Sequence, residues 1–192
     1  MRDPERGESK NDDSLSGVDR AGAFIGVTSL MKAVRTEDEI GCVLRSHLVA
    51  ESIMEKYLVS RTQEKLSRFF NFKDGRMSFS IKVQLCLAFG MPIEFGEFLV
   101  GLNKIRNKFG HDVESELNSR ELDGLAVICD NHGWSTDKPV RTKKLEITTN
   151  GDSKEYRYGD VNRRIDFLII FITFLPVFSG WAFDFCSRNS IK

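Results

Sequence analysis

Apolar residues recur every three or four positions over much of the chain, which predicts a mainly helical domain. The clearest helix is expected from Ile40 to Leu58, and the capping-box sequence Thr36–Glu39 would begin it. Two further helices are expected from about Glu94 to Phe109 and from about Ser119 to Cys129. Their inward positions are Phe95, Phe98, Leu99, Leu102, Ile105 and Phe109, followed by Leu122, Leu125, Ala126 and Ile128.

Two shorter helices complete the predicted helical part. One is expected within 21–34, where the chain first becomes apolar. The other would be capped by Ser78 or Ser80 and would end at Gly90 and Pro92, residue types that terminate helices in this order. Its apolar positions are Ile81, Leu85, Ala88 and Phe89.

The stretch 134–159 has a different pattern. Leu145–Thr149 and Glu155–Tyr158 have the composition of strands, and they flank Asn150-Gly151-Asp152. Because Asn-Gly favours the tight turn of a two-stranded ribbon, a small β-hairpin is the expected structure. A flexible insertion is the alternative.

The segment Phe167–Phe183 is almost continuously apolar and allows two interpretations. A membrane span needs about 20 apolar residues, so this segment is at the short limit, and Pro176 interrupts it. A buried helix that closes the core needs only to be covered by the other helices. The flanking residues Asp166 and Asp184 are poor membrane anchors. We therefore expect a buried helix, with a C-terminal membrane segment over 167–183 as the alternative.

Composition places the chain among ordinary globular proteins. Its 192 residues are enough for one domain with a sizeable core, and 28 basic residues balance 28 acidic ones. Any contact with nucleic acid must then come from a local patch. The polar stretch 1–20 lacks the apolar core of a signal peptide, and the four cysteines form no CxxC pair. We expect a disordered leader over 1–20 and a single helical domain over 21–188, in the cytoplasm.

The helix that approaches His111 carries a polar face beside its apolar stripe. Asn103, Asn107 and His111 are four residues apart and share that face, which Arg106 borders. Arginine offers a planar fork of donors for phosphate oxygens, and histidine can exchange a proton near neutral pH. The set suits phosphodiester chemistry without a metal. The alternative is that Arg106 and His111 only tie this helix to a neighbour.

The sequence Arg106-Asn107-x-x-x-His111 resembles the R-x(4–6)-H motif of HEPN domains (higher eukaryotes and prokaryotes nucleotide-binding). The wider stretch from Ile40 to Ile128, about half of the chain, resembles the mannitol-operon repressor family of bacterial proteins. The similar segments are Phe79-Ser80-Ile81-Lys82, Leu87-Ala88-Phe89-Gly90 and Ile105-Arg106-Asn107-Lys108-Phe109-Gly110-His111. The motif is short, but its position late on a helix that follows other helices is the expected one.

The resemblance implies an all-α antiparallel helical bundle that forms a homodimer with the motif helices facing each other. It implies metal-independent RNA cleavage, in which the ribose 2′-hydroxyl attacks the adjacent phosphate. Arg106 would stabilise phosphate charge, His111 would act as acid or base, and Asn107 would position one of them. A toxin or phage-defence role with an antitoxin partner would follow.

A non-catalytic function is the alternative. Several HEPN relatives lack nuclease activity, and the mannitol-operon repressors are named for regulation. The chain would then be a transcriptional regulator that acts through contacts with a regulatory protein partner. No helix-turn-helix is evident, and the basic pairs Lys143-Lys144 and Arg163-Arg164 are too sparse for a major-groove surface.

Other polar residues are weaker candidates. Glu51 and Glu55, one turn apart, could orient Arg106 or His111, although a solvated face is the more common role of such a pair. His47 lies beside apolar positions, which favours a hydrogen-bonded structural histidine.

A metal or nucleotide cofactor has little support in the sequence. Cys129 and His132 are two zinc-ligand types without a second pair, so no metal site is expected. No phosphate-binding glycine loop, serine-hydrolase motif or zinc-protease motif occurs, and no cofactor is expected.

Overall fold

The computed structural model describes residues 38–62, 77–111, 114–135, 138–149, 151–160 and 162–189, together with Lys32 and Val34. The predicted leader over 1–20 lies outside these residues, and so does the predicted helix within 21–34 apart from Lys32 and Val34, which are helical. The described elements are α3 (Glu39–Arg61), α4 (Phe79–Ala88), α5 (Ile93–His111), α6 (Ser119–Asn131), the 3-10 turn η2 (Val140–Thr142), β1 (Lys144–Thr149), β2 (Asp152–Arg157) and α7 (Arg163–Asn189).

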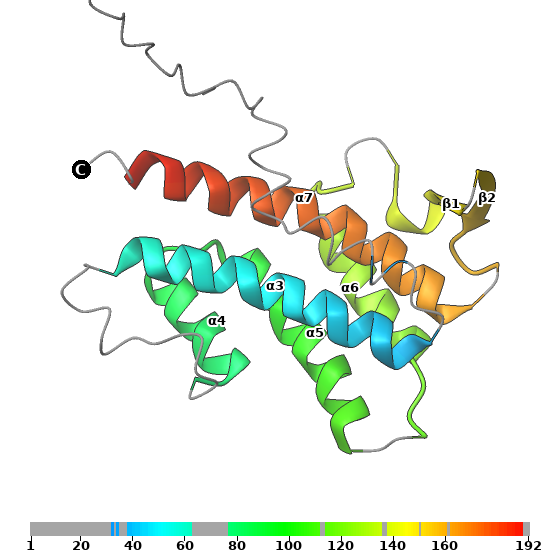
Figure 1. Cartoon of the computed structure of the whole chain (residues 1–192), viewed down its shortest axis with the longest axis horizontal. Coiled ribbons are helices and arrows are strands. Elements are labelled where there is room, and N and C mark those ends of the chain that lie inside the picture. The colour runs from blue at the N-terminus through cyan, green and yellow to red at the C-terminus, as the bar shows by residue number, and fades with distance from the viewer. Residues whose placement is uncertain are drawn as a thin grey trace, which may run out of the picture.

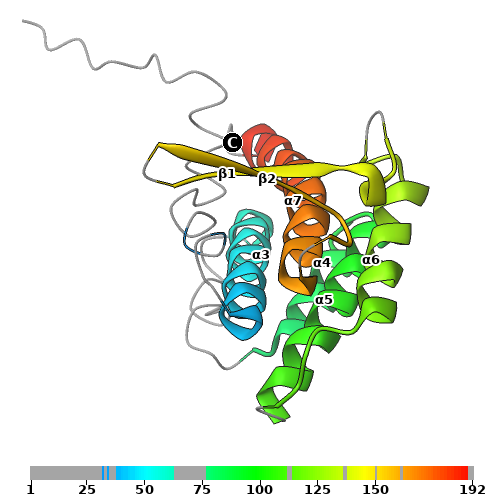
Figure 2. The same cartoon turned by 90° about the vertical axis from the view of Figure 1, so that its right-hand side faces the viewer.

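The helices form a bundle in which α5 packs against α3, α4 and α6, while α7 packs against α3 and α6 (Figure 1). Helix α5 runs opposite to α3, and α7 runs in the same direction as α3 (Figures 1 and 2). The prediction of a helical bundle with one small hairpin is confirmed.

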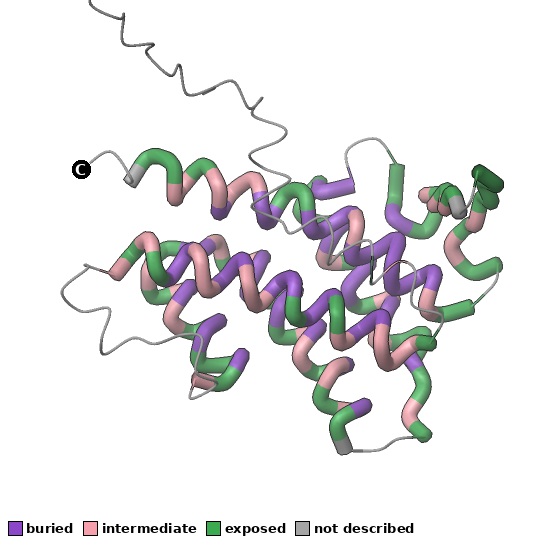
Figure 3. Tube along the Cα trace, in the orientation of Figure 1, coloured by how far each residue is buried: buried purple, intermediate pink, exposed green. Residues whose placement is uncertain are grey.

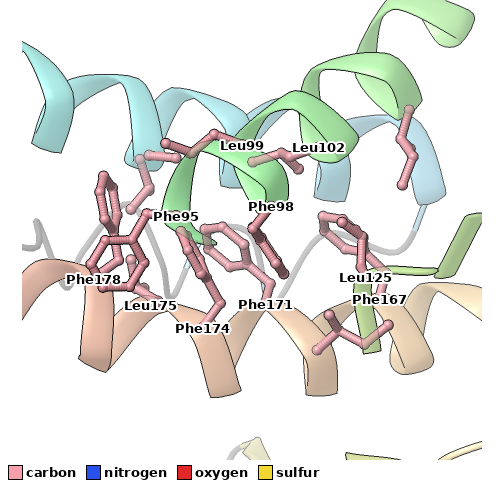
Figure 4. Close-up of a cluster of buried hydrophobic side chains, with 14 of the residues drawn as sticks. Phe95, Phe98, Leu99, Leu102, Leu125, Phe167, Phe171, Phe174, Leu175 and Phe178 are labelled. Carbon is pink, nitrogen blue, oxygen red and sulfur yellow. The ribbon is translucent and has the colours of Figure 1, made fainter. Parts of the chain in front are cut away.

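The core lies between α5 and α7 and is rich in aromatic rings (Figure 4). Phe98 of α5 stacks on Phe174 of α7 with ring centroids 3.8 Å apart and planes 8° from parallel. Every residue of the stripe predicted for α5 is buried, because its spacing of three and four matches the helical turn. Leu48 on α3 departs from the burial of apolar residues in the helices, since it is 61% exposed.

The N-cap of α3 lies two residues after the predicted one. It is Asp38, whose carboxylate accepts a hydrogen bond from the backbone N–H of Gly41, and not Thr36. Glu39, the expected fourth residue of the capping box, instead accepts a hydrogen bond from the backbone N–H of Leu117 at 2.7 Å. Glu39, which the local sequence assigned to a cap of its own helix, therefore joins α3 to the segment that precedes α6.

Helix α4 has the predicted ends but a different buried face. Ser78 caps its start, and at its end the N–H of Met91 donates to Cys86 and that of Gly90 to Leu87, at 2.9 and 3.0 Å. Gly90 has φ +99°, which glycine adopts without strain. The buried face is formed by Phe79, Lys82, Val83 and Cys86, whereas Ile81 and Ala88 of the predicted apolar set are exposed.

The predicted hairpin is present. Strands β1 and β2 pair antiparallel from Lys144–Arg157 to Thr149–Asp152. Gly151 has φ +90°, as the tight turn requires. Both strands contact α7, and η2 contacts α6 and α7.

Helix α7 contains the apolar segment and extends beyond it. Residues 165–171 are all buried, as Figure 3 shows by colour, so this part of the helix lies in the core as expected. The stretch Arg163–Arg188 is nevertheless long and apolar enough to cross a membrane by composition, with a mean hydropathy of 1.9, and 72% of its most apolar window is buried. Pro176 lies inside the helix at an exposed position, where a missing backbone N–H is tolerated at the solvated side.

Candidate functional site

The C-terminal half of α5 carries the predicted site. Its core side is anchored by buried Leu102, Ile105 and Phe109, so the polar residues between them are held at fixed positions along a rigid helix. Arg106 is half-buried and Asn107 is exposed. Nη1 of Arg106 donates a hydrogen bond to Oδ1 of Asn107 at 3.2 Å.

The guanidinium of Arg106 is directed along its own helix. A Cβ atom built on Gly110 would lie 3.6 Å from Nη1 of Arg106, so the side chain extends over the next turn. Among the described residues, none forms an ion pair with Arg106, and its one hydrogen bond is to its helical neighbour Asn107. The contacts of Arg106 with the described residues thus lie within α5.

Positive charge is concentrated on this part of α5. Between Asn103 and His111 the helix carries Lys104, Arg106 and Lys108 and no acidic residue. Nζ of Lys108 donates to the carbonyl of Glu116 at 2.9 Å and lies 3.6 Å from a carboxylate oxygen of Glu121. Lys104 and Lys108 are each two residues from Arg106, so they lie on the opposite side of the helix from it and do not form one surface with it.

His111 is the last residue of α5, and its side chain lies outside the described part of the structure. The backbone places it four residues after Asn107 and five after Arg106 on the same helix. The shared helix face predicted for Asn103, Asn107 and His111 is therefore retained for the backbone positions, and the role of His111 stays a prediction.

Asn103 connects the motif helix to α3 and α4. Its Oδ1 lies 3.2 Å from Nε2 of His47, and its Nδ2 donates to Oγ of Ser80 at 3.1 Å. The His47 ring also stacks on Phe79, with centroids 3.9 Å apart. His47 is thus a buried, hydrogen-bonded histidine, as predicted.

The charges around His47 come from all three helices. Burial lowers its pKa below the ordinary value of 6.5; the Asn103 hydrogen bond and Glu51 act in the opposite direction, and Arg106 and Lys82 act with burial. His47 is consequently neutral at neutral pH. Arg106 of the motif therefore lies close enough to His47 to influence its proton affinity.

Glu51 and Glu55 do not form the predicted solvated face. Oε1 of each lies 2.6 Å from Nζ of Lys82, whose residue is only 2% exposed. Both carboxylates raise the pKa of Lys82 against the opposing effect of burial. No hydrogen bond joins Glu51 to Arg106 among the described residues, so Glu51 contributes to the site through Lys82 and His47.

The pair Cys129 and His132 does not form a metal centre with other described residues. Cys129 is fully buried, and burial raises its pKa to about 12, which keeps the thiol protonated and unsuited to metal binding. His132 lies 3.9 Å from a carboxylate oxygen of Glu97. Within the described ranges, no group of three or more histidine, cysteine or acidic side chains could hold a metal ion.

Comparison of the chain with protein-family models, with curated proteins and with solved structures gives no significant match.

The sequence pointed to Asn103, Arg106 and Asn107 but not to the bond from Asn103 to α4. Ser80 and Lys82 stood out there only as a possible helix cap and as part of a segment similar to the mannitol-operon repressors. One signal was available: Phe79, Lys82, Val83 and Cys86 are spaced like the inward face of a helix. A lysine at such a position requires a carboxylate partner, and Glu51 and Glu55 lie one turn apart on another helix.

Proposed function

We propose that this protein is a metal-independent endoribonuclease of the HEPN-like kind, with Arg106, Asn107 and His111 as its catalytic residues. One observation carries the proposal: the Arg106 guanidinium is oriented by Asn107 and pairs with no described carboxylate, on a turn of α5 that ends in His111. An arginine without an acidic partner retains its capacity to bind a phosphate in bidentate fashion.

In the proposed reaction, the ribose 2′-oxygen attacks the adjacent phosphorus and the bond to the next nucleotide's 5′-oxygen breaks. The products are a 2′,3′-cyclic phosphate and a 5′-hydroxyl. One proton leaves the 2′-hydroxyl and one reaches the departing 5′-oxygen. His111 carries out one of these transfers and water the other, while Arg106 stabilises the charge on the phosphate.

Cellular context extends the proposal. The protein would act on RNA in the cytoplasm as a toxin or phage-defence component, restrained by an antitoxin-like partner. As a homodimer it would bring two copies of the Arg106–His111 surface close to one RNA strand.

The test is cleavage of a mixed-sequence RNA by purified protein and by single variants. We expect His111→Ala to lower the rate by about 10²–10⁴, and Arg106→Ala by about 10²–10³. Arg106→Lys should rescue poorly, because a point charge cannot replace the planar fork. Arg120→Ala, which removes an exposed arginine of α6, is the matched control and should cleave like the parent protein.

Two results would contradict the proposed function. One is an activity that His111→Ala leaves unchanged in a protein whose circular-dichroism spectrum is still helical. The other is the absence of RNA cleavage by the parent protein, which would favour the regulator that acts through protein contacts.

A further inference from the structure

A chain of hydrogen bonds leads from the buried interface of α3 to the exposed start of α4. His47 is 5% exposed, Asn103 is partly buried and Ser80 is exposed. The two links measure 3.2 Å from His47 to Asn103 and 3.1 Å from Asn103 to Ser80. The middle residue is on α5, one turn before Arg106.

The direction of each bond follows from the groups involved. Nδ2 of Asn103 donates to Ser80, so the oxygen of the amide faces His47 and can only accept. The neutral His47 ring must therefore carry its proton on Nε2. Because Oγ of Ser80 accepts from Asn103, its own hydrogen points elsewhere and is a donor at the exposed surface.

One cation of the proposed site lies near this chain of hydrogen bonds. Arg106 follows Asn103 by three residues on α5, and its charge acts on His47. Glu51 and Glu55 share Lys82, which balances one of their two negative charges. A polyanionic strand that places one phosphate at Arg106 and continues towards α4 would meet the Ser80 hydroxyl as a second donor.

We propose that Ser80 is a substrate-binding residue that donates a hydrogen bond to a second phosphate of the RNA strand, and that His47 and Asn103 are positioning residues for it. This inference rests on the proposed function and extends its substrate surface from α5 onto α4. His47 acts only through Asn103, whose amide it fixes in the orientation that presents the Ser80 hydroxyl.

The test measures binding of a fluorescein-labelled, fully 2′-O-methylated oligonucleotide, which cannot be cleaved because its 2′-oxygen cannot attack. Ser80→Ala should weaken binding about tenfold, the loss expected for one hydrogen bond to a charged group. Ser80→Thr retains the hydroxyl and should bind like the parent protein. Gln84→Ala, an exposed residue of the same helix, is the control and should have no effect.

The positioning role is tested by two substitutions of His47. His47→Phe keeps a ring to stack on Phe79 but loses the donor, so binding should weaken about as much as in Ser80→Ala. His47→Gln can still donate to Asn103 and should restore most of the affinity. A role limited to packing predicts the reverse order, with Phe tolerated better than Gln.

The outcomes separate this inference from the function on which it rests. Unchanged binding by folded Ser80→Ala, together with loss of cleavage in Arg106→Ala, would overturn the role of Ser80 and leave the nuclease proposal standing. Failure of the parent protein to bind the oligonucleotide would overturn both. Binding that depends on Ser80 without any RNA cleavage would support the α4 surface and contradict the catalytic assignment.

Discussion

At the scale of single residues, the fold constrains the protonation of His47. Its pKa is lowered by burial, and Glu51, Arg106 and Lys82 are the charged groups that act on it. As the pH falls below about 6.5, the unfolded chain takes up a proton at position 47 that the folded protein resists. The free energy of unfolding therefore decreases as the pH falls towards the lower pKa that His47 has in the folded protein.

We predict that His47→Gln removes this part of the pH dependence. Urea unfolding of the parent protein and of the variant, from about pH 7.5 to about pH 5.5, measures the difference. The parent should lose more stability over this range than the variant, because only the parent has a titrating group at this position. Equal losses would show that His47 is not held neutral by the fold.

Single residues also show where sequence reasoning stops. The positive φ angles of Gly90 and Gly151 were predictable, because they follow from local chemistry. The bond between His47 and Asn103 joins residues 56 positions apart, and no local pattern specifies it. The same holds for Lys82, whose two carboxylate partners are supplied by α3.

At the scale of elements, two glycines separate the effect of backbone conformation from that of side-chain contacts. Gly90 ends α4 with φ +99°, whereas Gly124 lies within α6. No atom lies within 4 Å of a Cβ built on either glycine. A methyl group added at these two positions therefore reports on conformation alone.

We predict opposite effects for Gly90→Ala and Gly124→Ala. The first should destabilise the protein by about 1–2 kcal/mol, because an L-residue is strained at positive φ. The second should stabilise it by about 0.5–1 kcal/mol through helix propensity. Chemical denaturation of both variants checks the prediction, and a change of the same sign in both would contradict it.

Element boundaries were predicted within a few residues, while the orientation of a short helix was not. The stripe of α5 is long enough to define its inward face, and all six residues are buried. Helix α4 is only 10 residues long and has apolar residues on more than one side, so Ile81 was assigned inward although it is 45% exposed. Packing against α3 and α5 decides between such faces, and that information is absent from the segment itself.

At the scale of the whole molecule, α5 has an exposed stripe that leads to the motif. Ile93 and Val100 are 65% and 54% exposed, and they lie on the same side as Glu97, Lys104 and Asn107, all of which are exposed. An exposed apolar pair on a helix that also carries opposite charges suits pairing with a second copy of itself.

We predict a homodimer formed along this stripe. Sedimentation at micromolar concentration should show a dimer for the parent protein, and Val100→Lys should shift it towards monomer by placing a charge in the interface. Val59→Lys on α3, at a residue that is 56% exposed, is the matched control and should remain dimeric. A parent protein that sediments as a monomer at every concentration tested would contradict the prediction of a homodimer.

The central claim is that the surface of α5 cleaves RNA without a metal. The most direct measurement is the end-group analysis of products from one RNA oligonucleotide incubated with purified protein in excess EDTA, beside the same sequence as DNA. The account predicts RNA fragments that end in a 2′,3′-cyclic phosphate, no cleavage of the DNA, and no products from Arg106→Ala. Activity that EDTA abolishes, or that cleaves the DNA equally well, would contradict it.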